Sequence, residues 1–236
     1  MNKLRVLSGG AAQGLVKNLA PAFTAATGLR IEGEFGAVGA MAEKLRKGTA
    51  ADVIILTSAL VATLATEKLV SSASVRDIGL VETALAVRAG DPLVAAKDAA
   101  SLREALRAAD AIFVPDTKAS TAGIHVAKVL EQLGIAREVE QRLRIFPNGA
   151  TAMRHLAESD ARRPIGCTQS TEIIATNGVA LSGSLPPGCA LATLYTAAVT
   201  TRTSAAPAAE GLIDLLTAAQ AGEARARAGF VPSRSM

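Results

Sequence analysis

The stretch 3-KLRVLSGGAAQGLVKNLAPAF-23 places a short apolar run, a Ser-Gly-Gly turn and a helical pattern in immediate succession. The run from Leu4 to Leu7 predicts a strand, and the apolar residues from Leu15 to Phe23 recur at helical spacing. Gly28 marks the expected end of this helix, because glycine readily adopts the left-handed backbone that closes many helices. A strand, a tight turn and a helix in this order predict the first unit of an α/β fold.

The same alternation continues along the rest of the chain. The pattern predicts further strands at 29–35, 52–58, 111–116, 143–146, 164–170 and 191–199. It predicts further helices at 40–48, after 58 through Leu69, at 101–109 and 122–134, from the turn 147–152 through Leu156, and from Pro207 to Ala228. The segment that contains 186-PPG-188 is expected to be a loop. The run 52–58 is rich in branched apolar residues, which predicts a strand covered on both faces.

This order predicts two lobes, each a mostly parallel sheet flanked by helices. No Gly/Ser/Pro-rich linker separates them, so we expect two strand crossovers, near Val81–Arg88 and Tyr195–Thr201. The predicted boundaries are 1–82 plus 198–236 for lobe I and 83–197 for lobe II. Two crossovers beside a cleft also predict hinge closure of the lobes.

Composition excludes several classes of protein. Half of the 236 residues are hydrophobic, only 3% are aromatic, and the net charge of +4 is spread along the chain. A nucleic-acid partner is not expected, because base stacking needs aromatic side chains and backbone binding needs a basic patch. No apolar run has the length of a membrane span, so membrane insertion is not expected either. Cys167 and Cys189 predict two buried, reduced thiols, with one disulfide as the alternative.

The amino terminus, MNKLRVLSGG, carries no apolar stretch of signal-peptide length before a cleavage site. If Met1 is the natural start, the expected location is the cytoplasm. If a leader has been removed upstream of it, the expected location is the periplasm. The sequence leaves both alternatives open.

Four strand-to-helix turns are rich in small or hydroxyl residues: 8-SGGAAQ-13, 36-GAVGA-40, 117-TKASTAG-123 and 148-NGATA-152. Each places backbone N–H groups at a helix start, where unpaired donors and the positive end of the helix dipole favour an anion. Small residues in one such turn are usually structural, whereas four alike indicate a shared anion. The residues expected to bind it are Ser8, Gly9, Gly10, Ala11, Ala37, Val38, Gly39, Lys118, Ser120, Thr121, Asn148, Gly149, Ala150, Thr168 and Gln169.

Other site chemistries lack their patterns. The chain has no GxxxxGK[ST] loop and no dinucleotide GxGxxG pattern, so no cofactor is expected. Neither His125 nor His155 has a Cys or carboxylate at ligand spacing, so no metal site is expected. Ser8 lies in no GxSxG pattern, which argues against a hydrolase nucleophile.

Three side chains are candidates for acid–base chemistry if the protein is an enzyme. Lys118 lies inside an anion turn, and its structural alternative is an exposed loop lysine. His125 falls within the following helix, where a surface or packed histidine is the structural alternative. Glu172 follows 168-TQST-171 and is either a general base or a helix-starting carboxylate.

The turns and their neighbours resemble the periplasmic molybdate-binding protein family. The resemblance covers nearly the whole chain in the family's order, in the segments 15-LVKNLAPAFTAATG-28, 34-EFGAVGAMAEKLRKGTAADVIILTS-58, 121-TAGIHVAKVLEQLGI-135, 165-IGCTQSTEI-173, 178-GVALSGSLPPG-188 and 229-GFVP-232. It implies an α/β, two-lobed type II periplasmic-binding-protein fold with a ligand cleft between the lobes.

The resemblance is weaker at the ligand. Members of the family commonly hold their oxyanion with a serine hydroxyl in each of the first two turns and with a tyrosine, and these positions correspond to Ala11, Val38 and Gln169 here. A buried oxyanion that loses hydroxyl donors loses roughly 1.5–3 kcal/mol for each hydrogen bond. An organic di- or tricarboxylate is therefore expected rather than molybdate.

Three functions follow from these observations. The first is a solute-binding protein that closes on a small anion and, if exported, delivers it to an ABC transporter permease. The alternative is a cytosolic isomerase of an unsaturated carboxylate, because aconitate isomerase is related to the resembled family. Such an enzyme moves a double bond by proton transfer in the same cleft. The third is a cytosolic ligand sensor without chemistry.

Overall fold

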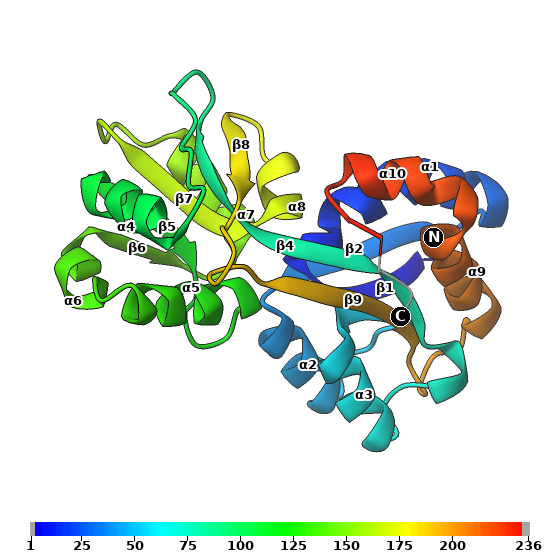
Figure 1. The fold of residues 1–236 in the computed structure, drawn as a ribbon. Coiled ribbons are helices and arrows are strands. Elements are labelled where there is room, and N and C mark those ends of the chain that lie inside the picture. Colours follow the sequence, from blue (N-terminus) through cyan, green and yellow to red (C-terminus); the bar gives the residue numbers. More distant parts are fainter. Residues whose placement is uncertain (1–2, 233–236) are drawn as a thin grey trace. The chain divides into compact units, whose positions relative to one another are not determined.

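The computed structural model describes residues 3–232, which form two compact units. Unit 1 contains the described residues up to Val81 and from Thr193 onward, and unit 2 extends from Glu82 to Ala192. The chain passes from one unit to the other within one long strand and again at the start of a second strand. Each unit is a sheet flanked by helices (Figure 1).

Unit 1 is built on three neighbouring parallel strands. Its elements are β1 (Lys3–Gly9), a 3-10 turn η1 (Gly10–Ala12), α1 (Gln13–Thr27), β2 (Arg30–Gly36), α2 (Val38–Arg46), β3 (Val53–Thr57), α3 (Ser58–Thr66), a 3-10 turn η2 (Ser72–Ser74), the first part of β4 (Arg76–Arg88), nearly all of β9 (Ala192–Val199), α9 (Ala206–Thr217), a 3-10 turn η4 (Ala219–Ala221) and α10 (Gly222–Arg227). The strand order is β2-β1-β3-β9-β4, with β9 antiparallel to β3.

Helices cover both faces of this sheet. Helices α1, α9 and α10 lie on one face, and α2 and α3 lie on the other (Figure 1). Every residue of β3 is buried, as expected for a strand between two helical layers. Gly28 has a φ of 73° and closes α1, which confirms the helix end expected there.

Unit 2 is also a sheet flanked by helices, but its helices are arranged differently. Its elements are the rest of β4, α4 (Ala99–Ala108), β5 (Ala111–Pro115), α5 (Thr121–Gln132), α6 (Ala136–Val139), a 3-10 turn η3 (Glu140–Arg142), β6 (Leu143–Phe146), α7 (Gly149–Ala157), β7 (Pro164–Gln169), α8 (Ser170–Ile174) and β8 (Val179–Ser184). The strands β6, β5 and β7 are parallel, and β4 pairs antiparallel with both β7 and β8.

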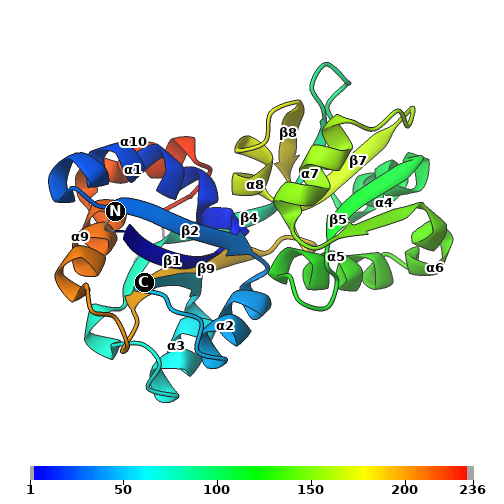
Figure 2. The same ribbon diagram turned by 180° about the vertical axis from the view of Figure 1, so that it is seen from behind.

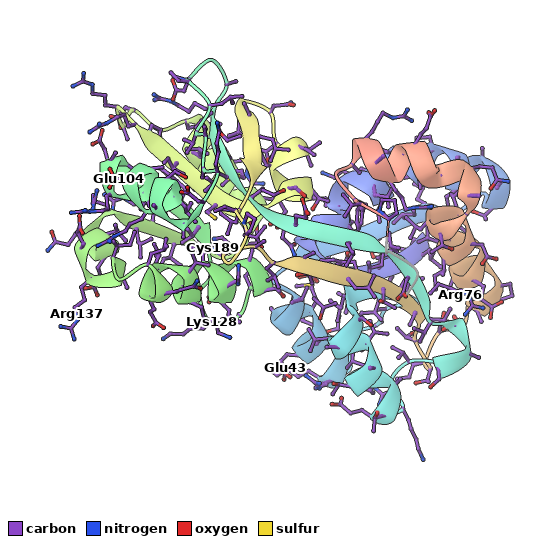
Figure 3. The ribbon with its side chains drawn as sticks, viewed as in Figure 1. Glu43, Arg76, Glu104, Lys128, Arg137 and Cys189 are labelled. Carbon is purple, nitrogen blue, oxygen red and sulfur yellow. The ribbon has the colours of Figure 1, made fainter. Side chains whose placement is uncertain are left out.

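Alternate residues of β5 enter two separate cores. Ile112 and Val114 pack with apolar residues of α4 and α5, whereas Ala111 and Phe113 pack with those of α7 and α8. Figure 2 shows α7 on the face of the sheet opposite α5. Charged side chains such as Glu104 and Arg137 point away from the helices of this unit (Figure 3). The period-2 alternation of a strand thus separates the two faces of the sheet.

Two expectations about the carboxyl-terminal half are wrong. The single helix expected from Pro207 to Ala228 is interrupted, because Ala218 has an extended backbone with ψ of 148°. The Arg225 guanidinium donates hydrogen bonds to the carbonyls of Leu216 and Ala218, which satisfies acceptors that the interruption exposes.

The second error concerns the loop segment expected around 186-PPG-188, because β8 (Val179–Ser184) precedes it as a strand. Glu172 lies in the first turn of α8, which agrees with its helix-starting alternative. The sequence 179-VALSGS-184 has a weak strand preference by itself. It becomes a strand by pairing with β4, across a register shift at Leu85 and Ala86.

Gly9, at the end of β1, is closely packed between two other elements of unit 1. A methyl group at this position would lie 2.7 Å from Val38 Cγ1 and 2.9 Å from Tyr195 Cε1. These side chains belong to α2 and β9, and both are buried. The end of β1, the start of α2 and the middle of β9 therefore meet at a position that only glycine fits without movement.

We expect Gly9→Ala to destabilise unit 1 by about 1–3 kcal/mol, because an added methyl in a packed core displaces its neighbours. The matched control is Gly211→Ala in α9, where an added methyl meets no atom within 4 Å. Alanine there should stabilise the helix by roughly 0.5–1 kcal/mol. Urea unfolding monitored by circular dichroism measures both changes. Equal effects at the two positions would contradict the close packing at Gly9.

Candidate anion-binding edges

In unit 1, the carboxyl ends of the parallel strands bring three helix starts to one edge of the sheet. Gly9 of β1 is in register with Gly36 of β2, and Ser8 is in register with Ile55 of β3. The elements η1, α2 and α3 each begin within two residues of these strand ends. Their first-turn N–H groups therefore point to a shared region, which is a favourable place for an anion.

These helix starts are not capped by side chains. As far as the structure describes the chain, the residues that precede η1, α1, α2 and α3 make no side-chain cap hydrogen bond. Gly10 and Gly39 are partly exposed at these turns, whereas Ala11, Ala37 and Val38 are buried. Ser8 is fully buried, and its hydroxyl donates to the Gly9 carbonyl at 2.8 Å. The first two turns thus present backbone donors and apolar side chains.

Tyr195 is a residue of this edge that the sequence analysis did not select. In β9 it lies opposite Thr57, the residue that precedes α3. Its ring packs at Gly9, with the hydroxyl 3.4 Å from the place a methyl at Gly9 would occupy. Phe230 contacts the same ring edge-on at a centroid distance of 6.5 Å. Tyr195 is the single tyrosine of the chain, but its place beside the first turn depends on the antiparallel pairing of β9 with β3.

In unit 2, the turn before α5 is shaped by Asp116. The Asp116 carboxylate accepts the N–H groups of Lys118 and Ala119 at 2.7 and 2.9 Å, and the Asp116 carbonyl accepts that of Ser120. Gly123 packs closely, since a methyl there would lie 2.2 Å from the Asp116 carbonyl oxygen. Asp116 therefore accepts the backbone N–H groups of residues 118–120. The N–H groups from Thr121 onward belong to α5.

Lys118, Ser120 and Thr121 remain available at this turn. Lys118 is exposed, and the side chains of Ser120 and Thr121 are partly exposed. No side chain caps α5 within the described part of the chain, so its first N–H groups have no intrahelical acceptor. One cation, two hydroxyls and a helix start thus lie within four residues of one another.

The turn before α7 already holds a carboxylate from the protein itself. Glu172 is 5% exposed, and it accepts hydrogen bonds from the Thr168 hydroxyl at 2.6 Å and from the backbone N–H groups of Ala150, Gln169 and Gly149. The fit is close, because a methyl at Gly149 would lie 1.9 Å from Glu172 Oε2. Glu172 therefore links the starts of α7 and α8.

This arrangement accounts for the donors that the sequence analysis assigned to a ligand at this turn. Asn148 accepts the Thr151 N–H at 2.8 Å, and Glu172 takes the N–H groups of Gly149 and Ala150. Thr168 and Gln169 are buried beside it. Ligand contacts at these residues stay a prediction, and in this structure the N–H groups of Gly149, Ala150 and Gln169 and the Thr168 hydroxyl donate to Glu172.

Burial raises the pKa of Glu172 above its usual value of 4.5, while the Thr168 hydroxyl and the three N–H groups oppose the shift. Burial likewise raises the pKa of the Cys167 thiol to about 12. Cys167 and Cys189 are free and buried, which confirms the expected thiols. Burial and the raised pKa argue against a nucleophilic role for Cys167.

The remaining candidates have structural contacts. His125 Nε2 donates to the Cys189 carbonyl at 2.8 Å, and Gln132 of the same helix donates to the Gly188 carbonyl at 3.0 Å. His155 stacks on Phe146 with a centroid distance of 4.4 Å. Over residues 3–232, no group of three or more His, Cys, Asp or Glu side chains is arranged to hold a metal. No helix in that range is long and apolar enough to cross a membrane.

We expect the contribution of Glu172 to stability to depend on pH. Because the folded-state pKa of Glu172 is raised, the stability that this group contributes is fully present below about pH 4.5. It is lost as the pH rises through the folded-state pKa. Glu172→Gln removes this titration. The unfolding free energy of the variant relative to the wild type should therefore increase as the pH rises through the folded-state pKa, and this difference should then become constant. Urea unfolding at several pH values measures the difference. Glu104→Gln on the exposed face of α4 is the control, and parallel curves for Glu172→Gln and wild type would contradict the expectation.

Comparisons with known proteins agree with this fold. The model of a family described as bacterial extracellular solute-binding protein matches residues 4–231. An aconitate isomerase from a Pseudomonas species is 25% identical over 240 residues, which cover 97% of this chain and 87% of the relative.

Two solved structures are similar at lower identity. The periplasmic molybdate-binding protein of Azotobacter vinelandii superposes with a TM-score of 0.83 and 18% identity, covering 98% of this chain and all of that one. A sulfate-binding protein from Mycobacterium tuberculosis superposes with a TM-score of 0.77 and 18% identity, covering 99% of this chain and 88% of that one. The chain belongs to the bacterial extracellular solute-binding protein family and has the type II periplasmic-binding-protein fold.

Proposed function

We propose that the protein binds a small organic di- or tricarboxylate through backbone N–H groups at these edges. The observation that carries the proposal is the unit 1 edge, where η1, α2 and α3 start without an N-cap side-chain hydrogen bond and the Tyr195 ring packs at Gly9, just before η1. Helix-start N–H groups stabilise a carboxylate without any change in protonation. The Tyr195 hydroxyl is a candidate for an additional donor.

The apolar side chains at this edge favour a carbon-containing anion over a compact metal oxyanion. Ala11 and Val38 are buried where the resembled molybdate-binding family has serines. A tetrahedral oxyanion presents oxygen in every direction, so apolar walls leave some of its oxygens without donors. A carboxylate ligand concentrates its charge at its ends and presents carbon between them.

Lys118, Ser120 and Thr121 are the residues of unit 2 that we assign to the same function. Their side chains have no hydrogen-bond partner within the described chain, whereas the donors at α7 are occupied by Glu172. The similarity to aconitate isomerase supports a carboxylate, because aconitate is a tricarboxylate. If the protein is exported, as its family description indicates, an ABC transporter permease is the expected partner.

A thermal-shift panel of oxyanions and carboxylates tests the class of ligand. We expect di- or tricarboxylates to raise the melting temperature and molybdate and sulfate to leave it unchanged. At a hundredfold its dissociation constant, a ligand stabilises the folded state by about 2.7 kcal/mol, which is readily measured. A shift produced by molybdate alone would refute the role given to Ala11 and Val38.

Substitutions in each unit then test the residues, with the ligand identified by the panel. Lys118→Met and Tyr195→Phe should each weaken binding by about 10- to 100-fold, because a hydrogen bond to a charged group contributes roughly 1.5–3 kcal/mol. Lys128→Met is the control for the first, since Lys128 is exposed on α5 and points away from the helix (Figure 3). Tyr195→Phe keeps the ring that packs at Gly9, so its melting temperature without ligand is its own control. Unchanged affinity in both variants would exclude these residues from the site.

The similarity to aconitate isomerase also favours a second candidate, proton-transfer isomerisation of an unsaturated carboxylate. Among the three acid–base candidates, the Glu172 carboxylate is buried and accepts hydrogen bonds from four donors, and His125 Nε2 donates to the Cys189 carbonyl. Lys118 has an exposed side chain without such a contact and is therefore the remaining candidate for proton transfer.

Incubation with cis- and trans-aconitate in deuterated water tests this activity by NMR. An isomerase should exchange the mobile proton and interconvert the isomers, and Lys118→Met should abolish both. Lys128→Met should retain them. Binding of a carboxylate without exchange in the wild type would leave the binding function in place and exclude isomerisation of these substrates.

A further inference from the structure

A cavity lies at the edge of the unit 2 sheet opposite its strand-to-helix turns. It has a volume of about 320 Å³ and is formed where β5 and β7 begin, beside the end of α4 and the segment that follows β4. Helices α5, α7 and α8 start at the carboxyl ends of the same parallel strands. The cavity is therefore separated from the candidate anion turns of this unit by the length of its strands.

The walls of this cavity are mainly apolar. Val87, Val94 and Ile165 contribute from the strands and the following segment, and Ala105 contributes from α4. Leu93, in the segment after β4 (Figure 1), is 60% exposed, more than any other large apolar side chain in the described chain. Exposed apolar surface beside a concave wall is the surface that an apolar ligand removes from water.

The charges around the cavity leave a single positive charge uncompensated. Asp91 pairs with Arg88 at 2.9 Å, and Asp110 pairs with Arg163 at 3.5 Å. Arg162 lines the cavity and has no ion-pair or hydrogen-bond partner within residues 3–232. The carbonyls of Arg107 and Ala109 at the end of α4 are bonded to Arg142 at 2.6 and 2.7 Å. The negative end of that helix is therefore already neutralised.

We propose that this cavity binds a small amphipathic monocarboxylate. The carboxylate pairs with Arg162, and the hydrocarbon chain lies against Ile165, Val87 and Ala105. A second negative charge would meet the apolar wall without a partner, which excludes the dicarboxylates and tricarboxylates proposed for the other edge. The volume lies at the lower end of the range of about 300–1,000 Å³ for ligand pockets, so a single short chain fits.

Calorimetric titration with butanoate, hexanoate, octanoate and decanoate tests the site. Affinity should rise about fourfold per added methylene, corresponding to roughly 0.8 kcal/mol, until the cavity is full, and should then stop rising. Octanol, which has the same chain without the charge, should bind at least tenfold more weakly than octanoate. Absence of saturable octanoate binding to the wild type would refute the proposal.

Three variants locate the bound octanoate. Arg162→Gln removes the proposed charge partner, and Ala105→Leu fills the cavity; each should weaken octanoate at least tenfold. Arg137→Gln changes an exposed arginine of the same unit (Figure 3) and should leave binding unchanged. Lys118→Met should also leave it unchanged, and loss of octanoate binding in Lys118→Met would place the probe at the other edge and refute the proposal. If Ala105→Leu does not fold, Arg162→Gln decides alone, and unchanged binding in that variant would also refute the proposal.

Discussion

Backbone N–H groups at the first turn of a helix have no acceptor within the helix, and this constraint organises the functional edges of both units. Parallel strands end at the same edge of a sheet, so each strand-to-helix turn adds donors to a common region. In unit 1 two of these turns lie beside the close packing of Gly9 with Val38 and Tyr195. In unit 2 the donors are divided between the turn before α5 and the carboxylate of Glu172.

Glu172 shows how the same physical chemistry serves structure and binding. Its carboxylate lies where a bound anion would lie in a turn of this kind, with one hydroxyl and three N–H groups as donors. The donors compensate part of the cost of burying the charge, while burial keeps its pKa raised. Glu172 belongs to α8, and its buried carboxylate is bound at the start of α7. This side chain therefore joins the starts of the two helices.

Much of the fold follows from local patterns. The strand and helix starting at Lys3 and Gln13, the left-handed Gly28 and the buried strand at Val53 agree with the spacing of their apolar residues. The errors fall where tertiary contacts outweigh local preference. Strand β8 depends on pairing with β4, and the interruption after α9 depends on Arg225 reaching the carbonyls of Leu216 and Ala218.

The residues of the candidate site also divide into those that local sequence identifies and those that tertiary contacts place. Small residues after strands, the substitutions at Ala11 and Val38 and the cation Lys118 are local features, so the chain alone was sufficient to select them. Tyr195 reaches the first turn because β9 runs antiparallel to β3, and Glu172 reaches the start of α7 because β7 and α8 bring it there. Local sequence determines which backbone groups become free donors, because that depends on where a helix begins. Only the tertiary structure decides which donors are filled, because their acceptors come from residues distant in the chain.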